Sequence, residues 1–143
     1  MTEYKELIDA FKDSITDPDL LKYTRDIQTD ILHAYIKYAC GKFKRICKKD
    51  LSKRSNEIEM FEYDLDDDEI SILVNWMIEA WSKPLYHNLE NMHNHLNTKD
   101  FTQYSPANLL DKVRNVYNDA HKRARSEMIE YSYIHSDLEN QKA

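Results

Sequence analysis

The chain has 143 residues, a formal net charge of −6, and 32% charged against 41% hydrophobic residues. Ten Tyr, four Phe and two Trp supply apolar area for one modest core, which argues against disorder, and a single glycine argues against an all-β fold, whose tight turns need glycine. The acidic balance disfavours general nucleic-acid binding, and the chain has no run of about 18 apolar residues that would predict a membrane span.

A short first helix is predicted near the N-terminus, with Thr2 as its cap and an apolar stripe of Leu7, Ile8 and Phe11. The sequence Thr16-Asp17-Pro18-Asp19 is expected to end it and to start a second helix. That second helix runs into the forties, with a face predicted at steps of four and three by Leu20, Thr24, Ile27, Ile31, Tyr35 and Tyr38. Leu21, Leu32, Ala34 and Ala39 are expected to widen this face. Gly41 is expected to weaken this helix or to end its first part.

Cys40 and Cys47 are the only cysteines. Seven residues apart on a helix, their Cα atoms lie roughly 10 Å from each other, at about 1.5 Å of rise per residue. A disulfide requires a separation below about 7 Å. We therefore predict two buried free thiols in a reducing compartment rather than a disulfide or a zinc site.

Residues 56–65 form a short segment that alternates weakly between apolar and polar positions. It is expected to be an extended connector lying on the helices, or an edge strand within an assembled sheet. The acidic run Asp66 to Glu69 follows it and is interpreted as a helix start, because carboxylates complement the positive end of a helix. A calcium loop is the less favoured reading, since the run has no glycine and its glutamate comes too early.

The rest of the chain predicts a long antiparallel helical hairpin, with helices at about 66–96 and 105–135. Pro84 lies inside the first of them and is expected to kink or split it. Ser105 and Pro106 suit the start of the second. The predicted fold is all-α: a small bundle of about four helices in a single domain over 1–135, followed by a polar, flexible tail over 136–143.

Four aromatic residues are candidate anchors of the core or of an interface: Trp76, Trp81, Phe101 and Tyr104. The two tryptophans lie in the apolar first helix of the hairpin. Phe101 and Tyr104 are expected to hold the turn onto the open end of the hairpin.

One strongly basic stretch stands out in this acidic chain, with seven basic residues in the 13 positions from 42 to 54. It is either a solvated helix face that pairs with acids of the same chain, or a surface that contacts a polyanion or an acidic partner. The candidate contacts are Lys42, Lys44, Arg45, Lys48, Lys49, Lys53 and Arg54.

The sequence contains no recognisable catalytic constellation. A chain with one glycine has no glycine-rich phosphate loop, and no Ser, His and acid arrangement stands out. We therefore expect no enzyme activity, no cofactor, no metal and no small-molecule substrate.

Two stretches, "DLDDDEISILVNWMIEAWSKPL" and "NTKDFTQYSPANLLDKV", resemble a family of small helical head and neck proteins of tailed bacteriophages. The shared pattern is an acidic helix start, an apolar helix ending at Trp81, a Lys-Asp-Phe turn at residues 99–101, and a Ser-x-Ala-Asn start of a long last helix at residues 105–108. It covers roughly residues 64–135, about half of the chain, and consists of turn and cap signals. The basic stretch has no counterpart in the pattern.

The resemblance implies a head–tail connector or adaptor in the virion neck, assembled in the host cytoplasm. Such a protein forms a homo-oligomeric ring below the portal and binds the portal and other neck or tail proteins. It surrounds the channel through which DNA passes, and no catalysis is expected of it. Two alternatives stay open from the residues: a small regulatory protein that inhibits or recruits a host protein, and nucleic-acid contact through residues 42–54.

Overall fold

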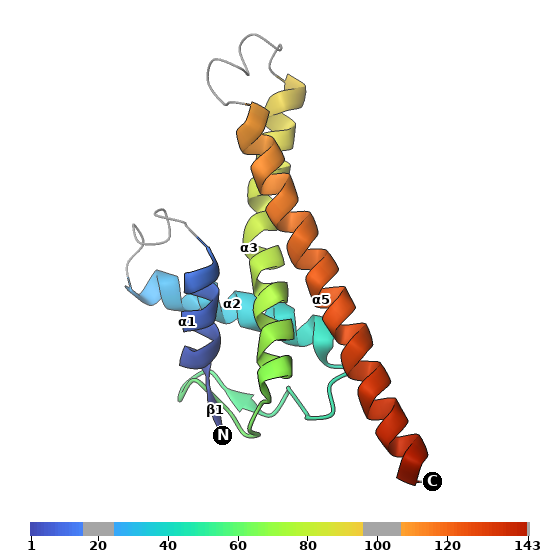
Figure 1. Ribbon diagram of the computed structural model, residues 1–143. Coiled ribbons are helices and arrows are strands. Elements are labelled where there is room, and N and C mark those ends of the chain that lie inside the picture. Colours follow the sequence, from blue (N-terminus) through green and yellow to red (C-terminus); the bar gives the residue numbers. More distant parts are fainter. Residues whose placement is uncertain (16–24, 96–106, 143) are drawn as a thin grey trace.

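The structure is a computed structural model, and it describes residues 1–15, 25–95 and 107–142. The elements in chain order are β1 (Thr2–Glu3), α1 (Tyr4–Ser14), α2 (Arg25–Phe43), β2 (Arg54–Ser55), β3 (Met60–Phe61), α3 (Asp67–His95) and α5 (Ala107–Lys142). The predicted fold class is confirmed: the chain is a small helical bundle built on a long hairpin of α3 and α5 (Figure 1).

α3 is the central helix of the bundle. It contacts α5 along its length on one side and α1 and α2 on the other, as Figure 1 shows. Six consecutive residues, Ile72 to Met77, are buried, so this part of the helix is covered on all sides. α3 also runs through Pro84 as one helix, so the predicted split does not occur.

The buried face of α2 overlaps the predicted one at Leu32 and Ala39 but is shifted from its centre. The predicted stripe included Ile27, which is 46% exposed, and Tyr35 and Tyr38, which are only partly buried. The buried face is centred one residue further along the helix, at Leu32, Ile36, Ala39, Cys40 and Phe43. Tyr35 and Tyr38 flank this face and pack against the core, and the Tyr38 hydroxyl is itself buried. The helix also continues past Gly41 and ends at Phe43.

The predicted extended segment contributes one strand, β3, of a small three-stranded sheet, and β2 lies just before this segment. β3 lies in the middle and pairs antiparallel with both β1 and β2, so that Phe61 is opposite both Thr2 and Arg54. Thr2 is therefore a strand residue and not the predicted helix cap: its side chain accepts a hydrogen bond from the Leu65 amide at 2.8 Å, and α1 begins at Tyr4 without a side-chain cap. The sheet fastens the N-terminus to the segment that leads into α3.

The two helices of the hairpin diverge toward the C-terminal end of α5 (Figure 1). The end of α2 and the turn after it reach α5 at this end: the rings of Phe43 and Tyr131 meet edge-to-face at 5.1 Å, and the Lys48 amide donates to the Tyr131 hydroxyl at 2.9 Å. α5 continues to Lys142, into the segment for which the sequence predicts a polar tail, and the flexibility of 136–143 stays a prediction.

Candidate functional site

The structure divides six of the seven basic candidates into two groups and leaves the exposed side chain of Lys48 outside both. Lys49 pairs with Glu69 at 2.7 Å and with Asp66 at 3.5 Å. Lys42 lies over the rings of Tyr38 and Trp76, at 5.5 and 5.6 Å, and Lys53 lies 5.9 Å from the ring of Tyr63. Of these three lysines, only Lys49 pairs with acids of the same chain, as the first alternative describes, whereas Lys42 and Lys53 are exposed and lie over aromatic rings.

The other group lines a basic groove of about 540 Å³. It lies between α2 and residues 50–54, and its basic lining residues are Lys37, Lys44, Arg45 and Arg54. Lys44, Arg45 and Arg54 belong to the predicted stretch. Lys37 lies outside the run of charges and was missed, although its spacing of seven from Lys44 places both on one helix face.

The floor of the basic groove is apolar. Cys40, Gly41 and Leu51 line it, with one acid, Asp50, at the rim. Gly41 leaves room there, since nothing lies within 4 Å of the position that a Cβ would take. Burial raises the pKa of the Cys40 thiol to about 11, so the sulfur is a neutral, apolar group in this lining. The groove thus combines a cationic rim with an apolar base.

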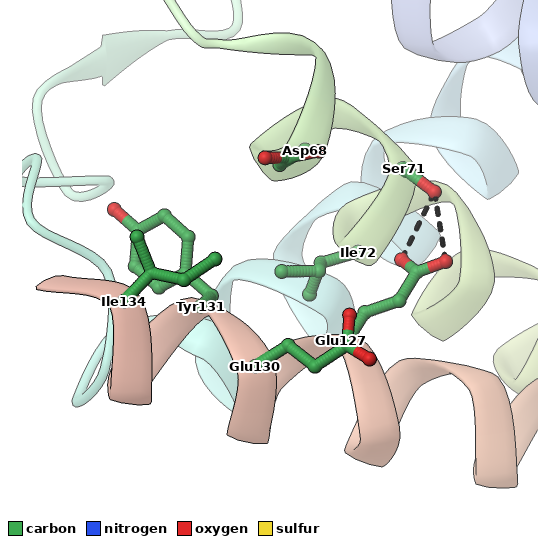
Figure 2. A pocket seen from close by; sticks show the side chains of 7 residues that line it. All are labelled: Asp68, Ser71, Ile72, Glu127, Glu130, Tyr131 and Ile134. Atoms are coloured by element: carbon green, nitrogen blue, oxygen red, sulfur yellow. Dashed lines mark hydrogen bonds between the residues drawn. The ribbon is translucent and has the colours of Figure 1, made fainter.

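A smaller acidic crevice of about 200 Å³ lies between the start of α3 and the C-terminal half of α5, as Figure 2 shows. Its carboxylates are Asp68, Glu127 and Glu130. The Ser71 hydroxyl of α3 donates to the Glu127 carboxylate of α5, at 3.1 and 2.9 Å from its two oxygens. The apolar side chains of Ile72, Tyr131 and Ile134 complete the wall.

Two buried glutamates of α3 form polar centres that the sequence did not single out. Glu69 is fully buried and accepts four hydrogen bonds: from the Asp66 amide and Lys49 on one oxygen, at 2.8 and 2.7 Å, and from the Tyr131 hydroxyl and the Cys47 thiol on the other, at 2.8 and 3.3 Å. This uses the full acceptor capacity of a carboxylate. A signal was present: Asp66 and Glu69 have the spacing of a capping box, in which the glutamate reaches back to the first amide.

The charge balance around Glu69 follows from these bonds. Burial alone would raise the pKa of Glu69, but the Asp66 amide, Lys49, Tyr131 and Cys47 all donate to the carboxylate and leave its pKa lowered. Burial and the adjacent carboxylate raise the pKa of the Cys47 thiol to about 12 and raise that of Tyr131. Glu69 is therefore an anion held by neutral donors and one lysine, which is a structural centre joining three elements.

Glu79 is 2% exposed and is far less well bonded. One oxygen lies 2.9 Å from the His121 Nδ1 atom. Within the described part of the chain, neither the other oxygen, which is buried, nor the buried Tyr38 hydroxyl has a hydrogen-bond partner. Burial, followed by the negative charge of Glu79, raises the pKa of Tyr38 to about 12, so the hydroxyl stays neutral beside the carboxylate.

The structure describes two of the four predicted anchors, Trp76 and Trp81. Trp76 is buried, its indole N–H donates to the Met128 sulfur at 3.0 Å, and its ring meets His121 edge-to-face at 5.6 Å. Trp81 is partly buried and packs against the core. Trp76 is thus a core residue that joins α3 to α5. Phe101 and Tyr104, with the predicted helix start at Ser105 and Pro106, lie outside the described residues.

The cysteine prediction is confirmed as far as it concerns bonding: both cysteines are free, Cys40 buried and Cys47 partly buried. Over the described ranges 1–15, 25–95 and 107–142, no group of three His, Cys, Asp or Glu side chains is placed to hold a metal ion. In the same part of the chain, no helix is both long and apolar enough to span a bilayer.

Comparison with known proteins gives no relative: no family model, no curated protein and no solved structure matches this chain.

Proposed function

We propose that this chain is a structural protein of a tailed-phage particle, a head–tail connector or adaptor that forms a ring below the portal and catalyses no reaction. The resemblance over residues 64–135 is the starting point. In the structure this range contains α3 and most of α5, the two helices that pack against each other through the middle of the molecule. The hairpin is thus the framework on which both the resemblance and the proposal rest.

The observation that supports binding to neighbours most directly is the outer surface of α5. Its inner side packs on α3 through Ala120, Ala124 and Tyr131. Three large apolar side chains of this half of α5 remain in solvent: Ile129 at 65% exposure and Tyr133 at 68% on the outer side, and Ile134 at 53% at the edge of the crevice with α3. Clustered exposed apolar side chains mark interaction surfaces, and a ring protein needs such surfaces on its long helices.

The direct test is the composition of the particle. Particles assembled from the genome that encodes this chain would be purified and analysed by mass spectrometry, and the tagged chain would be used to capture portal protein from the infected cell. We expect the chain in full particles in a fixed ratio to portal and the portal among the captured proteins. Absence from particles, with capture of a host protein instead, would reject the connector and favour the regulatory alternative.

A second candidate function is contact with nucleic acid through the basic groove, and it is favoured by the gathering of Lys37, Lys44, Arg45 and Arg54 in one place. A gel-shift titration at low and moderate salt tests it. The variant with Lys37→Glu and Lys44→Glu should abolish any shift. The matched control replaces Lys5 and Lys12 of α1, which have the same spacing and are also exposed. No shift at low salt, or equal loss in both variants, would reject specific contact at the groove.

A further inference from the structure

An exposed acidic and apolar ridge runs along the C-terminal half of α5. We define the α5 ridge as Glu127, Glu130, Tyr133 and Ile134, whose spacing of three, six and seven residues from Glu127 places them on adjoining parts of one helix side. Figure 2 shows Glu127, Glu130 and Ile134 in sequence along this side of the helix. Glu130, Tyr133 and Ile134 are exposed, whereas Glu127 is partly buried and its carboxylate accepts from the Ser71 hydroxyl of α3. The ridge therefore offers one fully exposed and one partly exposed carboxylate beside two large side chains in solvent.

The basic groove is the opposite of the ridge in charge, and it is hollow where the ridge projects. Its rim carries Lys37, Lys44 and Arg45, all exposed, where the ridge carries carboxylates. Its lining includes the nearly buried Cys40 and Leu51 and the exposed Gly41, and the open space lies at Gly41, where the ridge projects Tyr133 and Ile134. Cavities of roughly 300–1,000 Å³ take up drug-sized ligands. At about 540 Å³, the groove has room for these two side chains.

The two surfaces share no residue and lie on different elements: the ridge on α5, the groove on α2 and residues 50–54. A contact between unlike patches of identical chains is heterologous, and heterologous contacts that close generate rings. An isologous dimer, by contrast, would need a patch that is complementary to itself. The distribution of charge and apolar surface on this chain fits the first kind of contact.

We propose that the α5 ridge of one copy docks in the basic groove of the next copy, with Tyr133 and Ile134 on the apolar floor and Glu127 and Glu130 against the rim of Lys37, Lys44 and Arg45. This deepens the proposed function, on which its ring geometry rests, by naming the contact between neighbouring subunits. Complementary charge fixes the register of such a contact and speeds its formation, while the buried apolar side chains supply most of its affinity.

Charge reversal tests the docking on the full-length chain. One variant carries Glu127→Lys and Glu130→Lys, and the other carries Lys37→Glu and Lys44→Glu. Each alone should weaken self-association at least tenfold, measured by sedimentation velocity over a concentration series at moderate salt. Mixed in equal amounts, they should reassociate, because the reversed ridge meets the reversed groove at one interface and the native surfaces meet at the other.

Matched controls make this outcome specific. Asp9→Lys with Asp13→Lys, and Lys5→Glu with Lys12→Glu, change the charge equally at exposed positions of α1 and should leave association within twofold of wild type. Circular dichroism checks that each variant keeps its helices. A wild-type chain that stays monomeric at high micromolar concentration, reversals without effect, or a mixture that fails to reassociate would each overturn the docking.

Gly41 allows a test of the groove that changes no charge. Gly41→Trp should fill the open floor and block the ridge, with at least a tenfold loss of association, while Gly41→Ala should have little effect. Equal association of both variants would overturn the docking. If the chain associates through other surfaces, the docking is wrong but the connector function still stands. If the chain docks as described but is absent from particles, only the connector function is rejected.

Discussion

Glu69 and Glu79 lie on the same helix, are both almost completely buried, and differ in how fully they are bonded. Glu69 has four donors, two on each oxygen. Glu79 has one partner, His121, and an oxygen with none. An unsatisfied buried acceptor costs about 1–3 kcal/mol, more for a charged group, so the two carboxylates contribute to stability very differently.

The difference shows where rigidity is placed in the bundle. The Glu69 centre joins the start of α3, the turn after α2 and the C-terminal half of α5, beside the α5 ridge. The Glu79 centre lies further along α3, between Tyr38 of α2 and His121 of α5. We infer that the first centre fixes the position from which α5 presents its outer surface, while the second tolerates change.

The largest effect is expected from Glu69→Ala. It leaves Lys49, the Tyr131 hydroxyl and the Asp66 amide without their shared acceptor. Removing one member of a buried charge pair typically costs 3–5 kcal/mol, and since Lys49 can partly rehydrate we expect about 3 kcal/mol in the free energy of unfolding by urea. Asp68→Ala, at the exposed position next to it, should cost under about 0.5 kcal/mol. Equal losses in the two variants would contradict the role assigned to Glu69.

Glutamine substitution at both sites sharpens the comparison. In Glu69→Gln, the side-chain NH₂ group takes the place of an oxygen and faces groups that are themselves hydrogen-bond donors. We expect a loss of about 2 kcal/mol in the free energy of unfolding. At position 79 the same group can donate to the Tyr38 oxygen and satisfy it, so Glu79→Gln should lie within about 0.5 kcal/mol of wild type or above it. Urea unfolding of the two variants side by side measures this. A larger loss for Glu79→Gln than for Glu69→Gln would reverse the ranking of the two centres.

The hairpin was the part of the fold most open to prediction. Its apolar periodicity extends over two long segments, and a short polar link between such helices favours an antiparallel pair. The predicted ranges of 66–96 and 105–135 therefore match the starts of α3 and α5 to within two residues. The face of α2 was misplaced because its tyrosines were counted as core, whereas they flank it.

The small sheet and the Glu69 centre depend on contacts that no local pattern reveals. Strands of two residues carry no periodicity, and β3 is defined by pairing with Thr2 at the other end of the domain. Glu69 was recognisable as a helix-start acid, but its burial depends on Tyr131, which is 62 residues away. Likewise, the basic run indicated a surface, but its division into paired lysines and a groove required the path of the chain.

Replacing Tyr131 or Tyr38 by Phe removes a single hydroxyl group from one of the two centres, which allows the same comparison. Tyr131→Phe removes a hydroxyl that accepts from the Lys48 amide and donates to Glu69, and we expect a loss of about 1–2 kcal/mol. Tyr38→Phe removes a buried hydroxyl without a partner, so stability should be unchanged or raised by up to about 1 kcal/mol. Thermal and urea unfolding would show it, and a destabilised Tyr38→Phe variant would mean that this hydroxyl is bonded after all.

The smallest expected effect is on how the free energy of unfolding falls at acid pH. Folding lowers the pKa of Glu69 below its ordinary value of 4.5, so the folded chain holds this carboxylate ionised where the unfolded chain begins to bind a proton. The resulting stability is present above pH 4.5 and is lost as the pH falls through the folded pKa. In Glu69→Gln, unfolding free energies measured between pH 6 and 3 should fall less steeply than in wild type. Parallel slopes in wild type and Glu69→Gln would show that Glu69 does not couple folding to protons.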